Sequence, residues 1–328
     1  MMETMAHLPF IWLVLGGFVL EGLIAYPALM FKWIGHPVSW MGALIAMADR
    51  KTNSAGKRPV RDVIAGFLLV GLGGVALFSA AWQVSRALDV LPYGWVLELC
   101  FVASLLAARS LYNHVAVVRT ALMEDGVPAG RVAVSSIVGR NVDQLDERGI
   151  ARAAVESLAE SSSDGVVAPL FWVLVAGLPG LVLYKFVNTA DSLIGHHSDR
   201  YEQFGKTAAR LDDMMNWIPA RLTGMLFGLA AWPMGRAGAA LRVMWCDARL
   251  HASPNAGWPE AAMAGALNLR LGGPRCYGAV SENAAWLGAG RAALDGTDIQ
   301  TALDLYRRLL FIVMVCLLGV ALTVGEYA

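Results

Sequence analysis

Residues 63–84 read VIAGFLLVGLGGVALFSAAWQV and contain no charged side chain. A helix needs about 20 mostly apolar residues to cross the hydrocarbon core of a bilayer, so this segment is long enough to span it. Comparable apolar stretches lie at 8–30, 94–108 and 309–325. The stretch 94–108 is the weakest of them, because it is short and contains Glu98.

Two further apolar stretches, 166–186 and 218–233, are interrupted by Pro and Gly residues. Each is compatible with a full span, a re-entrant hairpin or a helix buried in protein, because interrupted backbone is tolerated at membrane depth only where protein or water surrounds it. We therefore expect about four to six membrane segments in one membrane-embedded domain, residues 1–328.

The composition supports this interpretation. Of the 328 residues, 57% are hydrophobic and 16% are charged, whereas soluble domains average about 45–50% and 25%. The 26 basic and 26 acidic side chains balance, which argues against a basic nucleic-acid-binding protein. The four cysteines form no CxxC pair, which argues against a disulfide scaffold or a Cys-based zinc site. The polar segments show little period-2 alternation, so we predict an all-α polytopic membrane protein.

The basic residues predict the orientation. No Lys or Arg precedes Lys32 or follows Arg308, and nearly all lie in segments 32–62, 109–164, 185–220 and 236–308. Because positive charge favours the cytoplasmic side, these segments are expected in the cytoplasm and both termini outside. This arrangement requires the two interrupted stretches to be hairpins or buried helices. A conventional six-span arrangement would place 185–217 outside.

Polar side chains cluster first in residues 137–171. Asp143 is expected to cap a helix that runs to about residue 159, followed by a turn at the sequence SSSDG. Arg152, Glu156 and Glu160 then share one helix face, with Asp164 just beyond. Carboxylates at a membrane boundary can hold Mg²⁺, which prefers oxygen ligands. The alternative is a solvated face with an Arg152–Glu156 pair.

Two more clusters follow along the chain. In residues 185–201, Asn188 or Thr189 is expected to cap a helix that has Asp191 in its first turn, and the His196–His197 pair is expected in a loop after Gly195. In residues 210–221, three oxygen-bearing side chains fall within one helical turn, and Arg221 follows as a candidate partner for a phosphate or carboxylate. The three are Asp212, Asp213 and Asn216.

The last cluster lies in residues 253–277. Asn255 belongs to a loop that is suited to hold a ligand, and Glu260 lies in the first turn of the helix after it. The small residues at 261–266 favour close helix packing, and a packing helix is the structural alternative. His36 lies in Gly-His-Pro-Val after the first apolar stretch, where a structural role is expected.

These blocks, in this order, resemble the CobD/CbiB family of cobalamin biosynthesis, the adenosylcobinamide(-phosphate) synthases. The matching pieces run from about residue 36 to 278 and read HPVSWMG, VESLAESSSDGVVAPLF, KFVNTADSLIG, DRYEQFGKTAARLDDMMNWIPARL and SPNAGWPEAAMAGAL. Each piece is short, but together they are specific. The resemblance implies an enzyme of the inner cell membrane with its active site facing the cytoplasm.

The resemblance also implies an ATP-dependent ligase, and phosphoryl transfer from ATP needs Mg²⁺. The ligase would join (R)-1-aminopropan-2-ol, or its O-phosphate, to the free propionate of adenosylcobyric acid and give adenosylcobinamide or its phosphate. The corrinoid is then a substrate, and the lipid bilayer is the other partner. A homo-oligomer, or contact with other corrinoid-pathway enzymes, stays open, and no nucleic acid is expected.

The residues and the resemblance lead together to a site hypothesis, since phosphoryl transfer needs metal-holding carboxylates and cationic or N–H groups for phosphate. The candidate metal ligands are Glu156, Glu160, Asp164, Asp191, Asp212 and Asp213. The candidate nucleotide- or substrate-binding residues are Lys185, Asn188, Asn216, Arg221 and Asn255. The candidate catalytic residues are Glu160, Asp164, Asp213 and Glu260, with Glu160 or Glu260 as the base that deprotonates the amine.

Two other functions remain as alternatives. An intramembrane Mg²⁺-dependent prenyltransferase would use Asp-rich helical motifs, which the sequence DDMMN resembles. A non-enzymatic transporter or signalling protein would account for the interrupted spans. In transporters, however, the charged residues lie within the spans, whereas here the carboxylates concentrate in the polar segments.

Overall fold

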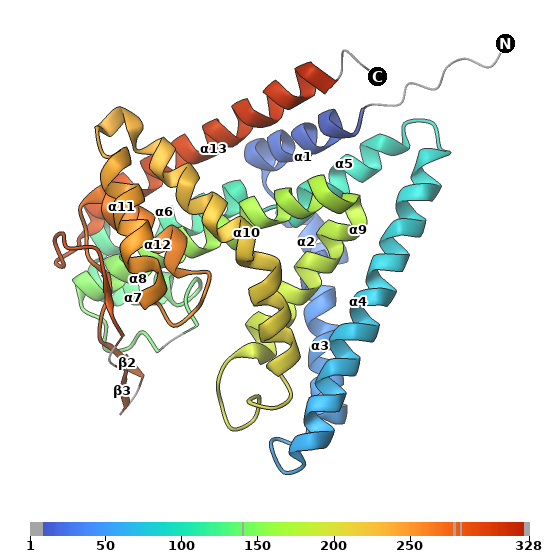
Figure 1. Ribbon diagram of the computed structural model, residues 1–328, viewed down its shortest axis with the longest axis horizontal. Helices are drawn as coiled ribbons and strands as arrows, with labels where there is room; N and C mark the ends of the chain where they lie inside the picture. Colours follow the sequence, from blue (N-terminus) through green and yellow to red (C-terminus); the bar gives the residue numbers. More distant parts are fainter. Residues whose placement is uncertain (1–8, 140, 278–279, 283, 325–328) are drawn as a thin grey trace. The chain divides into compact units, whose positions relative to one another are not determined.

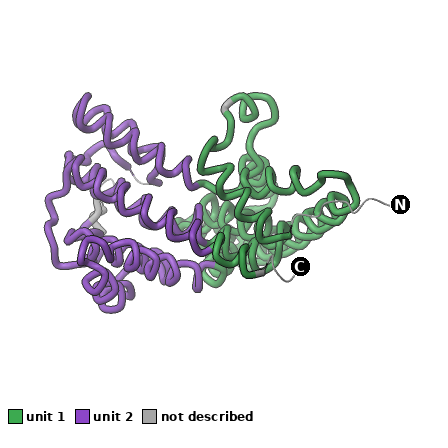
Figure 2. The backbone as a smooth tube through the Cα atoms, turned by 90° about the horizontal axis from the view of Figure 1, so that it is seen from above, with its two compact units in different colours: residues 1–107, 168–215, 317–328 green, residues 108–167, 216–316 purple. Residues whose placement is uncertain are grey.

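The computed structural model describes residues 9–139, 141–277, 280–282 and 284–324. It is 78% helical with almost no strand, so the predicted all-α class is confirmed. The chain divides into two compact units, coloured separately in Figure 2. Unit 1 contains residues 1–107, 168–215 and 317–328, and unit 2 contains residues 108–167 and 216–316.

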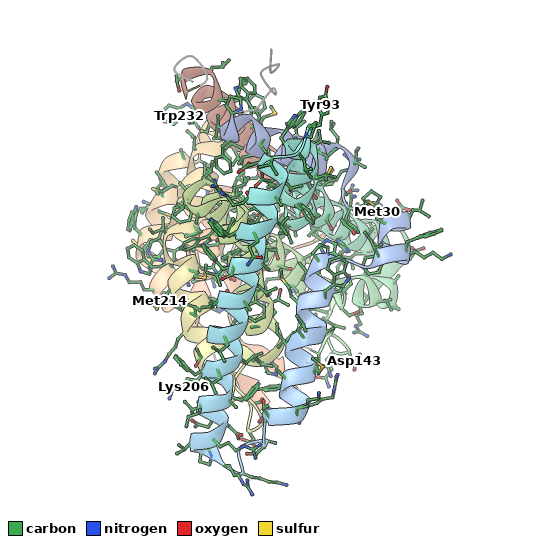
Figure 3. All side chains as sticks on the ribbon, turned by 90° about the vertical axis from the view of Figure 1, so that its right-hand side faces the viewer. Met30, Tyr93, Asp143, Lys206, Met214 and Trp232 are labelled. Atoms are coloured by element: carbon green, nitrogen blue, oxygen red, sulfur yellow. The ribbon has the colours of Figure 1, made fainter. Side chains whose placement is uncertain are left out.

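Unit 1 is a group of helices around α9. Its complete elements are α1 (Phe10–Ile24), α2 (Ala28–Ile34), α3 (Pro37–Thr52), α4 (Pro59–Asp89), α5 (Gly94–Leu105), α9 (Ala168–Ala190) and the π-helical turn η2 (Asp191–Gly195). It also holds the start of α10 (Lys206–Ala230) and the end of α13 (Gly296–Val324). Figure 1 shows α3 beside the long helix α4, and the two are in contact. The exposed Tyr93 marks the turn that leads from α4 into α5 (Figure 3).

The core of unit 1 lies between α9 and its neighbours. Tyr184 and Phe186 of α9 are fully buried, in a cluster with Ile45, Val70 and Phe204. A glycine permits one close approach, since a Cβ atom at Gly73 of α4 would lie 2.8 Å from the Phe186 ring. The opposite face of α4 exposes large apolar side chains, among them Phe67, Leu72, Val75 and Trp82. Such a face fits contact with lipid and would be unfavourable in water.

Four helices are long and apolar enough to cross a membrane, within the described residues. They are Pro59–Asp89, Gly94–Glu124, Glu147–Gly195 and Gly296–Thr323, and a bent pair, Phe10–Ile24 with Leu29–Thr52, makes a fifth if counted as one span. This agrees with the expected four to six segments. The predicted segment 218–233 is not among them, since it forms the second half of α10 and the turn Trp232–Met234.

The interruption predicted in 166–186 is present. Helix α9 breaks at Ala176 and Gly177, where Gly177 has φ of +64°, and Pro179 follows. A residue with a Cβ atom is strained at this φ, and Pro cannot donate the next helical hydrogen bond. In the weaker segment 94–108, helix α5 ends at Leu105, and Glu98 accepts a hydrogen bond from Ser85 Oγ at 2.7 Å. That bond satisfies one oxygen of a buried carboxyl group.

Unit 2 is also mainly helical. Its elements are α6 (Ala108–Glu124), α7 (Gly126–Val134), α8 (Glu147–Ser162), the π-helical turn η1 (Ser163–Val167), the end of α10, the turns η3 (Trp232–Met234) and η4 (Ala248–Leu250), α11 (Ala237–Asp247), α12 (Gly257–Leu267) and most of α13. Two short antiparallel hairpins join them, β1 (Leu271–Gly272) with β4 (Trp286–Leu287) and β2 (Arg275–Tyr277) with β3 (Val280–Glu282). The sequence patterns did not predict these hairpins.

Small residues bring α10, α11 and α12 together, as the sequence predicted for 261–266. A Cβ atom at Gly265 would lie 2.6 Å from the Ala239 carbonyl oxygen of α11. Gly224 of α10 similarly faces the Met244 side chain and the Trp258 carbonyl. The start of α12 is thereby fixed against α10.

Three predicted local features are wrong or differ in place. The cap of α8 is Asp146, whose Oδ1 accepts from Gly149 N at 2.8 Å, and Asp143 lies outside the helix. The predicted turn at SSSDG is the π-helical turn η1, so the chain continues in helical form into α9. Asn188 and Thr189 lie inside α9, so they do not cap a helix. By contrast His36 caps α3 by accepting from Val38 N, the structural role expected for it.

Candidate functional site

The twelve candidate residues divide between the two units. Unit 1 carries five of them, Lys185, Asn188, Asp191, Asp212 and Asp213. Unit 2 carries the other seven, Glu156, Glu160, Asp164, Asn216, Arg221, Asn255 and Glu260. Their contacts are therefore described within each unit.

The loop before α12 is the best-defined polar centre of unit 2. Ser253 Oγ accepts from the backbone N–H groups of Asn255 and Ala256, each at 3.2 Å, which turns the chain into α12. Gly257 is required there, because a Cβ atom would lie 2.2 Å from the Ala248 carbonyl oxygen. The turn leaves Asn255 buried at the start of α12.

Arg221 of α10 stacks between two tryptophan rings. Its guanidinium carbon lies 4.2 Å from the Trp217 ring centre and 4.4 Å from that of Trp258. Its Nη1 donates to the Trp217 carbonyl at 2.6 Å and lies 3.4 Å from Asn255 Oδ1. Stacking and these polar contacts fix the plane of the guanidinium, and a fixed fork of donors suits recognition of a carboxylate or phosphate.

Glu260 and His251 form a pair that sequence reasoning missed. His251 Nε2 lies 3.6 Å from Glu260 Oε1, and the two side chains are 15% and 2% exposed. His251 Nδ1 accepts from Ser253 N at 3.0 Å, so in the neutral ring the proton is on Nε2 and faces the carboxylate. A lone histidine carries no local sequence signal, and only the folded loop brings it to Glu260.

The three candidate carboxylates of α8 and η1 lie in different environments. Glu156 is buried, and its Oε1 accepts from Gly272 N at 2.7 Å, so this carboxylate anchors strand β1. Glu160 is exposed, and Asp164 in η1 is half-buried. Of the three, Glu160 is the most exposed and Glu156 the most buried.

In unit 1, the end of α9 lies against the start of α10. Asn188 Nδ2 donates to Asp212 Oδ1 at 3.2 Å, which links the two predicted clusters. Burial raises the pKa of the neighbouring Asp213 carboxyl, because desolvation disfavours its charged form. Lys185 is buried on the same helix as Asn188, and Asp191 opens the turn η2.

His196 and His197 follow Gly195 in a loop, as predicted. His197 Nδ1 contacts Glu202 Oε2 at 2.8 Å, and this hydrogen bond raises the pKa of the imidazole. Both partners are largely exposed, so the pair resembles a surface contact more than a metal site.

Within the described part of the chain, no three His, Cys, Asp or Glu side chains converge as a complete metal site. Mg²⁺ commonly keeps several waters and takes only one or two protein carboxylates together with substrate phosphates. Glu160 and Asp164 in unit 2, and separately Asp213 in unit 1, carry the oxygen donors that such a magnesium ion takes.

Comparison with known sequences agrees with the resemblance of the motifs. The sequence model of a family described as CobD/Cbib protein matches residues 14–306. Curated relatives named "Cobalamin biosynthesis protein CobD" include that of Rhodobacter capsulatus, 48% identical over 314 residues and 93% of each chain. Those of Brucella suis and Rhizobium meliloti are 50% and 43% identical, each over 88% of this chain and 90% of the relative. No solved structure matches the chain.

Proposed function

Because the chain belongs to the CobD/CbiB family of cobalamin biosynthesis proteins, we propose that it forms the amide bond between adenosylcobyric acid and an amino alcohol. The amine is (R)-1-aminopropan-2-ol or its O-phosphate, and the product is adenosylcobinamide or its phosphate. The observation that best supports this is the centre of Arg221, Asn255, Glu260 and His251. It combines a fixed guanidinium with a buried carboxylate, the groups needed for one acidic and one amine substrate.

A carboxylate is a poor electrophile, so the propionate must be activated before an amine attacks it. A propionate oxygen would attack the γ-phosphorus of ATP and release ADP, and Mg²⁺ would neutralise the phosphate charge in that step. The amine nitrogen then attacks the acyl carbon, and inorganic phosphate leaves as the amide forms. One proton must leave the ammonium before this attack and a second as the amide forms.

We assign the first proton transfer to Glu260. Its carboxylate is buried, and His251 Nε2 faces one oxygen, so the group is held in one orientation. Glu160, the other candidate base, is exposed. Arg221 and Asn255 bind the anionic and polar groups of the substrates, since the aromatic rings fix the guanidinium and Asn255 lies beside it.

The remaining candidates are proposed to bind the metal ion, phosphate groups or other parts of the substrates. In unit 2, Glu160 and Asp164 are proposed to hold the Mg²⁺ of Mg²⁺–ATP through carboxylate oxygens, and Asn216 to form part of the substrate pocket. In unit 1, Asp191, Asp212 and Asp213 are proposed as further metal ligands, Lys185 as a partner for a substrate phosphate and Asn188 as part of a pocket wall. Glu156 is assigned a structural role, because its carboxylate accepts a hydrogen bond from Gly272 N. The apolar faces of α4 and its neighbours are proposed to hold the protein in the inner membrane, with the site open to cytoplasmic ATP.

The test is an assay of the full chain purified in detergent micelles. Adenosylcobyric acid, ATP and Mg²⁺ are supplied with either aminopropanol or its phosphate, and the corrinoid product is identified by mass. We expect ATP-dependent product, and a 10²- to 10⁴-fold lower kcat for Glu260→Gln, the range lost with a general base. Arg242→Gln, an exposed position on α11, is the matched control and should keep wild-type turnover.

Two results would contradict the proposal. ATP hydrolysis that is independent of both the corrinoid and the amine would exclude the coupled reaction. Release of diphosphate from a prenyl donor, without any amide product, would favour the prenyltransferase alternative instead.

A further inference from the structure

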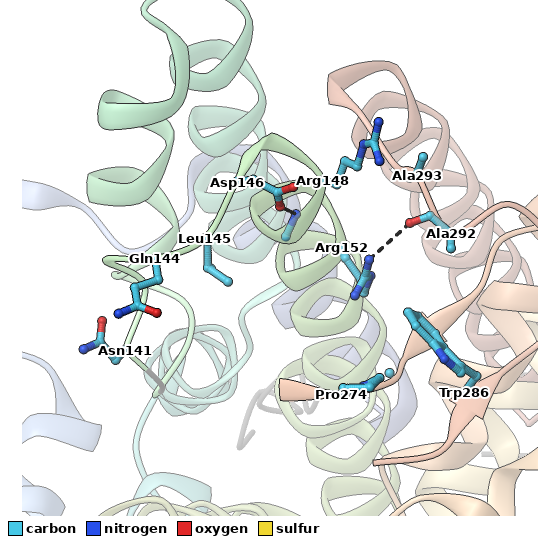
Figure 4. Close-up of a pocket in the computed structure, with 12 residues that line it drawn as sticks. Asn141, Gln144, Leu145, Asp146, Arg148, Arg152, Pro274, Trp286, Ala292 and Ala293 are labelled. Carbon is cyan, nitrogen blue, oxygen red and sulfur yellow. Dashed lines mark hydrogen bonds between the residues drawn. The ribbon is translucent and has the colours of Figure 1, made fainter. Parts of the chain in front are cut away.

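Unit 2 contains a cavity of about 530 Å³ at the beginning of α8, separate from the Arg221 centre. Its size falls in the range of about 300–1,000 Å³ that is typical of small-molecule sites. The wall is made by the loop before α8, the first turns of α8, the β1–β4 hairpin and residues 292–293 (Figure 4).

Guanidinium groups give the cavity a positive charge. Arg148 and Arg152 of α8 line it, and Arg152 Nη2 donates to the Ala292 carbonyl at 3.2 Å, drawn as the dashed line between these two residues in Figure 4. Among the residues that the structure describes, Asp146 is the one acidic residue of the lining, and its Oδ1 accepts from Gly149 N as the cap of α8. Arginine forks match the oxygens of phosphate groups, so the cavity suits a phosphorylated ligand.

The same wall presents a rigid aromatic ring. The Arg152 guanidinium carbon lies 4.8 Å from the centre of the Trp286 ring, and that of Arg270 lies 5.7 Å from it. Gly273 allows this position, because a Cβ atom there would lie 2.4 Å from the ring. The Arg270 guanidinium adds positive charge beside the ring. Among the described residues, its buried Nε has no hydrogen-bond partner.

Amide side chains complete the cavity. Asn141 and Gln144 line it from the loop before α8, and Figure 4 shows them at the opposite end from Trp286. Each amide offers both donors and an acceptor, so these groups can bind hydroxyls or phosphate oxygens. A planar ring, fixed cations and amides are together the groups that recognise a nucleotide.

We propose that this cavity binds the nucleoside triphosphate, with phosphate groups on Arg148 and Arg152 and the heterocyclic base at the Trp286 end. The inference rests on the proposed function, which requires ATP, and it adds a place for ATP that the family motifs do not contain. The cavity wall is tied to the acidic part of α8, because Glu156 holds Gly272 N at 2.7 Å. Arg148, Arg152 and Trp286 therefore become specificity-determining residues for the nucleotide.

The experiment measures ATP binding to the full chain in detergent micelles, without the corrinoid or the amine. Equilibrium dialysis with labelled ATP gives the Kd, and cross-linking with 8-azido-ATP followed by peptide mapping gives the site. We expect the label on peptides that contain 141–152 or 284–293. The Kd should rise at least tenfold in Arg148→Gln/Arg152→Gln and in Trp286→Ala, and stay within twofold in Arg242→Gln.

Arg148→Gln alone guards against a folding defect, because Arg148 is exposed and its replacement leaves the Arg152–Ala292 contact intact. It should weaken ATP binding severalfold while the protein elutes and unfolds as wild type. Competition with inorganic triphosphate tests the base, and we expect it to displace the label much less effectively than ATP. Equal competition would overturn the assignment of Trp286.

The failures of the two proposals are distinguishable. If wild type makes the ATP-dependent amide product but the cavity variants bind ATP with an unchanged Kd, the cavity proposal is wrong and the proposed function stands. If wild type neither binds ATP nor makes product, the proposed function itself fails, and the cavity assignment fails with it.

Discussion

Asp213 is a carboxylate whose burial is unfavourable for folding. Because its pKa is raised by desolvation, the folded state prefers the protonated form. The stability that the protonated group contributes is present below the pKa of the unfolded state and is lost as pH rises through the raised pKa of the folded state. At neutral pH the charged form therefore opposes folding. Such an unfavourable carboxylate is consistent with a role in binding a cation.

Asp213→Asn should consequently affect stability and activity in opposite directions. The amide stays neutral, so we expect the free energy of unfolding in micelles at pH 7 to rise by up to about 1 kcal/mol, after discounting for partial exposure. Turnover should fall at least tenfold if the carboxylate holds magnesium. Thermal unfolding and the amide-forming assay are measured on the same preparation. A variant that is both less stable and fully active would contradict this interpretation.

At the scale of the element, α13 begins at a reciprocal cap. Asp295 Oδ1 accepts from Thr297 N at 2.8 Å and from Asp298 N at 3.3 Å, while Asp298 Oδ2 accepts from Asp295 N at 2.9 Å. Arg291 Nη2 binds Asp298 Oδ1 at 2.5 Å. The hydrogen bonds from Thr297 lower the pKa of the Asp295 carboxyl, so its charged form stabilises the helix start.

Asp295→Ala should lower the free energy of unfolding by about 1 kcal/mol at pH 7, the usual effect of losing a helix cap. Asp295→Asn keeps an acceptor and should lose less than half as much. Because the pKa is lowered, the contribution is full above the unfolded pKa, near 3.8, and is lost as pH falls through the lower folded value. The difference between wild type and Asp295→Ala, measured by thermal unfolding, should shrink over that acidic range. A constant difference would show that the charge has no part in the cap.

The break in α9 gives a second prediction for an element. Gly177 has φ of +64°, so Gly177→Ala should destabilise unit 1 by about 1 kcal/mol or more. Gly71 in α4 is the matched control, because it is helical and a Cβ atom added there would meet nothing within 4 Å. Gly71→Ala should instead stabilise the protein by up to about 1 kcal/mol through helix propensity. Thermal unfolding of both variants in micelles checks the opposite signs, and equal shifts would exclude backbone strain at Gly177.

At the scale of the whole molecule, the apolar pattern predicted the helices well because length and absence of charge determine which segments can span a membrane. The turn predicted at SSSDG was wrong, although serine, aspartate and glycine favour a turn locally. In the fold Ser162 is buried and its hydroxyl donates to the Leu158 carbonyl at 2.6 Å, so helical structure continues. Tertiary burial thus outweighed local preference.

The site was predictable only as a set of residue types. Arg221, Asn255 and Glu260 could be selected from charge and position, and all three lie in the loop–helix centre of unit 2. His251 could not, because its partner Glu260 depends on the turn that Ser253 and Gly257 build. The cavity at Trp286 likewise depends on a hairpin whose strands are too short to leave a periodic pattern.

The membrane orientation is the remaining prediction at this scale, and it follows from the distribution of positive charge. Segments 109–164 and 185–220 both carry basic residues, so both are expected in the cytoplasm, where ATP is available. The turn between α4 and α5 contains none and is expected outside. A six-span arrangement would separate the two basic segments and remove Asp212 and Asp213 from the compartment of Glu160.

Single cysteines in a background free of Cys100, Cys246, Cys276 and Cys316 distinguish the two arrangements. The positions are His197, whose side chain is 93% exposed, the exposed Asp125 and, in the outer turn, Val90, which is 69% exposed. An impermeant maleimide added to intact cells should label only Val90→Cys, and Asp125→Cys and His197→Cys should react after permeabilisation. Labelling of His197→Cys in intact cells would place 185–217 outside. The predicted cytoplasmic location of this segment would then be wrong.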